Sequence, residues 1–171
     1  MAFLVKNRVK EPGGDAVISQ LIHVSRGTQT IPESTTEILF RVHNGRVLVH
    51  KLIGEVTTVI QTQTDNLKVT GKALNDAAAA VGTAVDVASN KDITGLEVGG
   101  SVFVEGDGTA LVQSNAGNVL IGANSGNWVM PQGEIYITTS ATNTGAMKWD
   151  IWYQPLDKDA YVLDNAVQAA I

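Results

Sequence analysis

The chain has 171 residues, a formal net charge of −5 and no cysteine. This length suits a single domain, and the lack of cysteine excludes a disulfide framework, a thiolate zinc site and a cysteine nucleophile. Its 12 lysines and arginines are scattered along the sequence. Because nucleic-acid binding requires clustered positive charge, we expect no nucleic-acid partner.

The sequence also lacks membrane and export signals. No segment reaches the roughly 18 consecutive apolar residues of a transmembrane helix. The first residues carry no apolar stretch of the kind found in a signal peptide. We therefore expect no membrane association, and synthesis and folding in a cytoplasm.

The N-terminal residues predict an arm followed by one domain. Residues 3–9 lead into the turn sequence Glu-Pro-Gly-Gly at 11–14. We expect an N-terminal arm over residues 1–14 and a single all-β domain over residues 15–171.

The domain's first segment, residues 15–24, fits a short amphipathic helix. Asp15 would be the N-cap, and Val17, Leu21 and Val24 would share one face. A strand fits the same residues only slightly less well.

Two hairpins are predicted next. Residues 37–42 alternate between apolar and polar, Asn44-Gly45 favours a type I′ turn, and residues 46–53 form the returning strand. The second hairpin would join residues 59–64 to residues 67–70 through Asp65-Asn66.

The middle of the chain has weaker signals. Residues 73–80 form a helix-like run that ends at Gly82, and the same run also fits a loop at a sheet edge. Residues 115–127 are rich in Gly, Asn and Ser, which is typical of a loop.

The C-terminal third has the clearest strand pattern. Residues 134–139 alternate, and a turn at 143–145 reverses the chain. In the following strand one face carries Met147, Trp149, Ile151 and Tyr153, and the other carries Lys148, Asp150 and Trp152. Short strands with a turn every 8–12 residues predict a β-sandwich or distorted barrel with jelly-roll-like or Greek-key connections.

No constellation in the sequence predicts chemistry. His43 and His50 would lie near each other across the first hairpin, but no suitably spaced carboxylate joins them as a third metal ligand. The serine-nucleophile and phosphate-loop motifs are absent. We expect no catalytic residue, no metal, no cofactor and no enzymatic activity.

The tryptophans near the C-terminus raise two alternatives. Trp149 and Trp152 point to opposite faces of one strand, so one belongs to the core. The other, Trp152, would be covered by another element or another subunit, or would form a platform for a sugar ring.

Three C-terminal segments carry a wider pattern, and residues 52–71 extend it, so that it covers about two thirds of the chain. The segments are Trp128-Val129-Met130-Pro131-x-Gly133, Thr144-Gly145-x-x-Lys148-Trp149-Asp150-x-Trp152-Tyr153-x-Pro155-Leu156-Asp157 and Ala160-Tyr161-Val162. The pattern resembles a group of structural proteins of tailed-bacteriophage virions. The resemblance implies a decoration (cement) protein on the capsid, often a trimer seated between capsid subunits, and it supplies no catalytic residue.

We therefore expect a homo-oligomer, with a trimer favoured, that binds the major capsid protein on the outer surface of the virion and stabilises the shell. The candidate interface residues are Phe3 and Val5 in the arm, and Trp152 and Tyr153 in the last long strand. A tail, baseplate or head–tail component and a carbohydrate-binding attachment module remain as alternatives.

Overall fold

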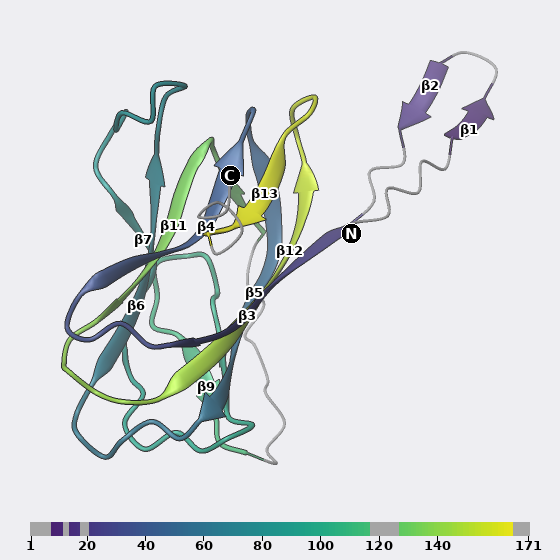
Figure 1. Ribbon diagram of the computed structural model, residues 1–171. Helices are drawn as coiled ribbons and strands as arrows, with labels where there is room; N and C mark the ends of the chain where they lie inside the picture. The colour runs from purple at the N-terminus through teal and green to yellow at the C-terminus, as the bar shows by residue number, and fades with distance from the viewer. Residues whose placement is uncertain (1–7, 12–13, 18–20, 117–126, 166–171) are drawn as a thin grey trace.

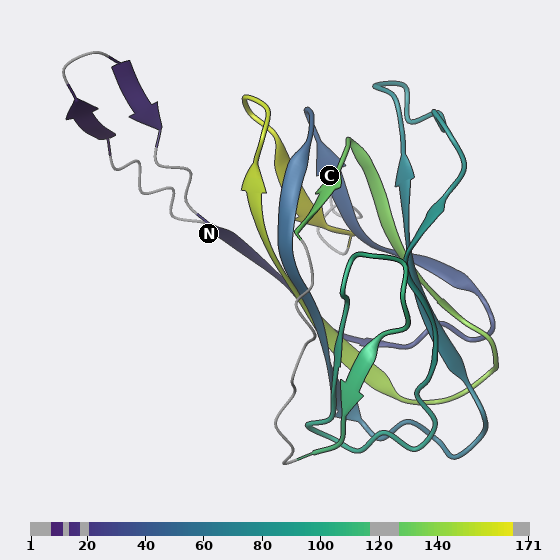
Figure 2. The same cartoon turned by 180° about the vertical axis from the view of Figure 1, so that it is seen from behind.

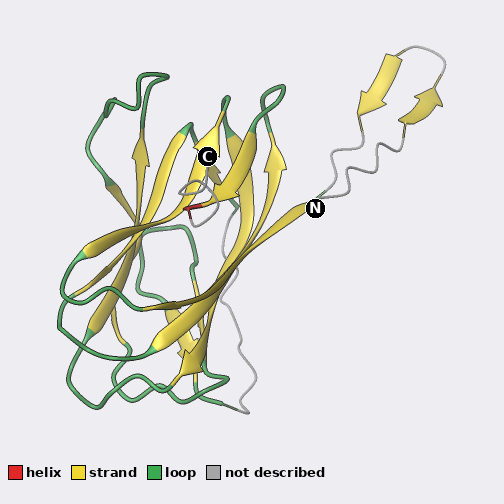
Figure 3. Cartoon of the chain, viewed as in Figure 1, coloured by secondary structure: helices red, strands yellow, loops and turns green. Residues whose placement is uncertain are grey.

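The computed structural model describes residues 8–11, 14–17, 21–116 and 127–165, and these residues form an all-β sandwich (Figure 1). Strands joined by loops and turns make up nearly all of this part of the chain (Figure 3). The strands are β1 (Arg8–Glu11), β2 (Gly14–Val17), β3 (Ile22–Thr30), β4 (Thr36–His43), β5 (Val47–Thr58), β6 (Asn66–Ala73), β7 (Val85–Asp92), β8 (Ser101–Phe103), β9 (Val112–Ser114), β10 (Trp128–Met130), β11 (Gly133–Thr139), β12 (Ala146–Pro155) and β13 (Tyr161–Asp164).

The two main sheets have jelly-roll topology. One sheet has the order β3-β12-β5-β8-β9, with β10 also paired to β5, and the other has the order β13-β4-β11-β6-β7. The antiparallel pairs β3·β12, β4·β11, β5·β8 and β6·β7 nest inside one another along the chain. One long folded hairpin rolled into two sheets gives this pattern, which defines a jelly roll.

The predicted hairpin around Asn44-Gly45 is wrong, although the turn itself is present. Asn44 and Gly45 both have positive φ, 58° and 128°. However, β4 lies in one sheet and β5 in the other, so this turn carries the chain across the sandwich. A strand that alternates apolar and polar residues must bury its apolar face. The apolar face of β4 packs against the sheet that contains β5, and the apolar face of β5 packs against the sheet that contains β4.

The other two predicted reversals are corrected in the same way. Residues 59–65 join β5 to β6, and residues 140–145 join β11 to β12; both connections run from one sheet to the other. Residues 59–64, predicted as strand, are loop. These connections bond to each other instead, since the Gln61 N–H donates to the Thr144 carbonyl at 3.1 Å.

The N-terminal region is extended rather than helical. β2 and β3 are strands, so the helix predicted over residues 15–24 is wrong wherever the structure describes those residues. β1 pairs antiparallel with β2, and both views place this two-stranded hairpin apart from the two sheets (Figures 1 and 2). The division between arm and domain at residue 14 stays a prediction.

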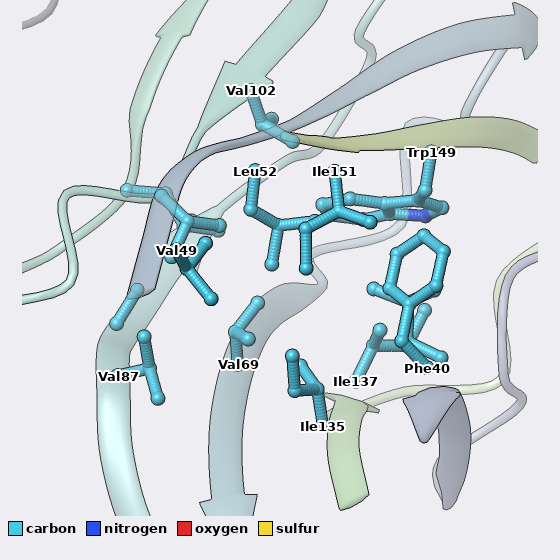
Figure 4. Packing of buried hydrophobic residues seen from close by; sticks show 14 of the residues in the cluster. Phe40, Val49, Leu52, Val69, Val87, Val102, Ile135, Ile137, Trp149 and Ile151 are labelled. Carbon is cyan, nitrogen blue, oxygen red and sulfur yellow. The ribbon is translucent and has the colours of Figure 1, made fainter. Parts of the chain in front are cut away.

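The core lies between the inner faces of the two sheets. Trp149 and Ile151 of β12 face Phe40 of β4 and Ile137 of β11, and all four are at most 5% exposed (Figure 4). The predicted apolar face of residues 147–153 is therefore confirmed. Side chains alternate along the strands, so every second residue of both sheets points into this interior, as in other β-sandwiches.

Arg26 of β3 is a buried cation that connects the two sheets along one side of the sandwich. Its side chain is 8% exposed, and Nη1 donates to the carbonyls of Ile38 and Leu39 in β4. Its Nε lies 3.8 Å from Oδ1 of Asp164 in β13. A buried cation is stable only with such partners, so Arg26 ties the edge of one sheet to the edge of the other.

The interior leaves no room at Gly54 of β5, which lies between Trp149 and Val102 on the neighbouring strands. A Cβ there would approach Met147, Trp149 and Val102 to 2.8–2.9 Å. We expect Gly54→Ala to lower the free energy of unfolding by about 1–3 kcal/mol through overpacking. Urea denaturation measures this.

Gly27 of β3 is the matched control, because a Cβ there meets nothing within 4 Å and its φ is not in the left-handed region. Gly27→Ala should change the unfolding free energy by less than about 0.5 kcal/mol. Equal effects of the two substitutions would contradict the tight packing described for Gly54.

Candidate interaction surface

Three of the connections at one end of the sandwich define what we call the β6–β7 end. They are the turn at residues 44–46, the β6–β7 loop at residues 74–84 and the β12–β13 loop at residues 156–160 (top of Figure 1). β3 also starts here, because Ile22 pairs with Tyr153 near the end of β12. This end therefore combines the longest described loop with the attachment point of the N-terminal region.

Exposed apolar side chains are concentrated at the β6–β7 end. Of the eight large apolar residues that are exposed in the described part of the chain, two lie at the opposite end, Val59 and Val98, each 52% exposed. The other six lie on the loops or strand ends of the β6–β7 end: Leu21, Val81, Val85, Val129, Leu156 and Tyr161. Large exposed apolar patches are a feature of interaction sites, so this end is the candidate interaction surface.

The two most exposed of these side chains are Val81 of the β6–β7 loop, at 66%, and Val85, the first residue of β7, at 65%. Hydrogen bonds within the loop fix its shape. Asn75 Oδ1 accepts the N–H groups of Ala77 and Ala79 at 3.0 and 2.9 Å. The Val81 N–H donates to the Ala73 carbonyl at 3.0 Å. The loop thus presents apolar side chains on an ordered backbone.

An ion pair joins the other two connections of this end. The Asp157 carboxylate accepts the Arg46 N–H at 2.7 Å, and the guanidinium donates to it through Nε at 2.9 Å and Nη2 at 2.8 Å. These bonds lower the pKa of Asp157 to about 2. A Cβ at Gly45 would overlap the Asp157 side chain, so the turn and the β12–β13 loop fit only because residue 45 is glycine.

Trp152, the predicted interface residue on β12, is half-buried. The His23 ring of β3 stacks on it, with centroids 4.6 Å apart and an interplanar angle of 15°. His23 Nε2 lies 2.7 Å from Asp150 Oδ1, which holds the imidazole over the indole. An element of the same chain therefore covers part of Trp152, and its role between subunits stays a prediction.

Tyr153, the other predicted interface residue on β12, faces the opposite side of the strand from Trp152. Tyr153 is 2% exposed, and its hydroxyl oxygen accepts the Val162 N–H at 3.1 Å. Its side chain therefore belongs to the core of this chain, and its role between subunits stays a prediction. Phe3 and Val5 lie outside the described residues.

The two strand histidines lie in different sheets and contact different residues. His50 lies on β5 and approaches Gln154, whereas His43 lies on β4 and stacks on Tyr161 at 5.1 Å. The predicted proximity of His43 and His50 across a hairpin is wrong, because their strands belong to different sheets. Residues 8–11, 14–17, 21–116 and 127–165 contain no group of three or more His, Cys, Asp or Glu side chains that could hold a metal ion.

The structure offers a small hollow between the sheets. It is lined by residues that include Arg26, Leu39 and Trp149 and has a volume of about 10 Å³, enough for about one water molecule. No helix among the described residues is long and apolar enough to span a membrane.

The comparisons with known proteins match solved structures but no family and no curated protein. No protein-family model matches the chain, and no curated protein matches it. Two solved structures, of the Gt and Gx strains of infectious bursal disease virus, align at 12% identity with TM-scores of 0.35 and 0.30. The alignments cover 92% and 96% of this chain but 43% and 48% of the matched chains, so the chain spans less than half of their length.

His43 gives a test of the environment beside the β6–β7 end. Burial and the nearby Arg41 lower the pKa of His43, and its Nε2 is buried without a hydrogen-bond partner. The unfolded chain therefore binds more protons as the pH falls below about 6.5, so the native state loses stability there. We expect His43→Gln to lose less stability than the wild type between pH 7 and pH 5.

Urea midpoints at the two pH values measure this difference. The carboxylates titrate in both proteins. The difference between the two proteins in how far the urea midpoint falls from pH 7 to pH 5 therefore isolates the contribution of His43. An equal fall of the urea midpoint in both proteins would contradict a lowered pKa of His43.

Proposed function

We propose that the chain is a structural protein of a virion, a decoration protein that binds the outside of a bacteriophage capsid and stabilises the shell. The observation that carries the proposal is the concentration of exposed apolar side chains on the ordered β6–β7 end. The jelly roll supports it, because this architecture recurs in viral capsid domains and in lectins. The resemblance of residues 128–162 to tailed-phage virion proteins supports the same class.

The proposed mechanism is burial of the β6–β7 end against capsid subunits. Apolar burial drives most protein association, and a loop that is already ordered loses little conformational freedom on binding. Because the decoration protein binds the assembled shell and not its separated subunits, binding shifts the equilibrium toward the shell.

The oligomer is part of the proposal. We propose a homo-oligomer, with a trimer favoured, in which the arm containing β1 and β2 reaches a neighbouring subunit. A two-stranded hairpin of this size has little stability alone, and both views show it away from the sandwich. A contact with another chain would supply the missing stabilisation.

The docking surface can be tested with the double substitution Val81→Ser and Val85→Ser. Each valine side chain contributes about 1.5 kcal/mol or more when fully buried, so we expect the affinity for undecorated capsids to fall by at least about tenfold. Co-sedimentation of purified protein with capsids measures it.

The matched control is Val59→Ser with Val98→Ser, since these valines are 52% exposed at the opposite end. The control protein should bind capsids like the wild type. Equal loss in both variants, or no loss in the first, would contradict docking through the β6–β7 end.

Copy number tests the class of virion protein. The chain should be present in purified particles in several hundred copies, because a decoration protein follows the capsid lattice. Quantitative mass spectrometry against the major capsid protein gives this ratio. A dozen copies or fewer would indicate a tail, baseplate or head–tail component instead, and absence from particles would favour the glycan-binding alternative.

A further inference from the structure

Among the described residues, two of the buried side-chain oxygens without partners lie where the β5–β6 and β11–β12 connections meet, at the end of the sandwich opposite the β6–β7 end. They belong to Asp65, which precedes β6, and to Asn143, which precedes β12. Asp65 is 0% exposed and Asn143 is 1% exposed. Buried polar atoms are nearly always hydrogen-bonded, so this pair requires a physical explanation.

Asp65 uses one of its carboxylate oxygens. Its Oδ1 accepts the N–H groups of Ser140 and Ala141 at 2.9 and 3.0 Å, and the Ser140 hydroxyl at 3.3 Å. Its Oδ2 is buried and accepts nothing. Within the described residues no Lys, Arg or His forms an ion pair with Asp65.

Asn143 is oriented by its donors. Both hydrogens of its amide are used, because Nδ2 donates to the carbonyls of Gln63 and Gln61 at 2.9 and 3.3 Å. Exchanging the amide oxygen and nitrogen would place Oδ1 against those two carbonyls. Oδ1 therefore stays on the other side of the group, buried and without a donor.

The two side chains belong to one junction. Asp65 reaches from its own segment to Ser140 and Ala141, while Asn143 reaches back to Gln61 and Gln63. Both oxygens without partners thus lie where segments 61–65 and 140–143 are joined. We call this the Asp65–Asn143 junction.

The missing partner must be positive or must donate hydrogen bonds, since both free atoms are acceptors. A buried water can donate to two oxygens, but it leaves the carboxylate charge uncompensated in a medium of low polarity. A cation compensates that charge and coordinates both oxygens. Carboxylate and amide oxygens, together with main-chain carbonyls, are the ligands that calcium prefers.

We propose that the Asp65–Asn143 junction binds a calcium ion through Asp65 Oδ2 and Asn143 Oδ1. Main-chain carbonyl oxygens of the joined segments and water complete the coordination. The ion would fix the connections β5–β6 and β11–β12 to each other. It would therefore stabilise the end of the sandwich that lies opposite the docking surface.

Thermal unfolding of the full chain in calcium chloride and in EDTA tests the site. Because a ligand that binds only the native state stabilises it by mass action, millimolar calcium should raise the midpoint by about 5 °C or more. Isothermal titration with calcium should show one site per chain. Equal midpoints in calcium and EDTA, with no heat of binding, would overturn the proposal in favour of a buried water.

Asp65→Asn separates the site from a general salt effect. The substitution removes the charge and supplies an amide that can donate to Asn143 Oδ1, so the variant should fold and lose its response to calcium. Asp107→Asn is the matched control, because Asp107 is an exposed carboxylate bonded to Thr109, and it should keep the full response. An equal calcium response in both variants would overturn the assignment, and titration of the wild type decides the question if Asp65→Asn does not fold.

Discussion

The connections that cross between the two sheets control the whole architecture. Stacked sheets lie about 10 Å apart, and β4–β5, β5–β6 and β11–β12 each carry the chain over that distance. Strands such as β3, β4 and β5 consequently pair with partners far away in the sequence. The central strand β12, paired with both β3 and β5, places Trp149 and Ile151 opposite the second sheet. The interior exists only when all the crossings are made.

The two ends of the sandwich differ in the side chains that they expose. At one end, buried side chains such as Asp65 and Asn143 bond to the main chain of the neighbouring connection. At the β6–β7 end, Val81 on the loop held by Asn75 and Val85 at the start of β7 remain exposed. A rigid framework with one apolar end suits a protein that assembles onto a surface, and the Arg46–Asp157 pair keeps the neighbouring connections in place there.

Strand positions could be read from the sequence far better than strand partners. Alternation along residues 147–153 shows which side chains face the core, and it does so correctly. It contains no information on which strand lies alongside, so Asn44-Gly45 was interpreted as a hairpin turn rather than a crossing. Residues 77–85 contain no charged residue and no clear period. The sequence therefore did not show that the apolar side chains of this segment are exposed. The partial cover of Trp152 by His23 depends on β3, a segment whose pattern also fitted a helix.

The nested pairing of strands also sets the order in which the protein can fold. β6 and β7 are neighbours in the chain and can pair early, whereas Ile22 of β3 must wait for Tyr153 of β12. Closing such distant contacts carries a large entropy cost and slows folding. On the ribosome, the edge of β3 therefore stays open until residues 146–155 have emerged. The sandwich can close only after β12 has been made, and it must then close before the open strand edges meet those of another molecule.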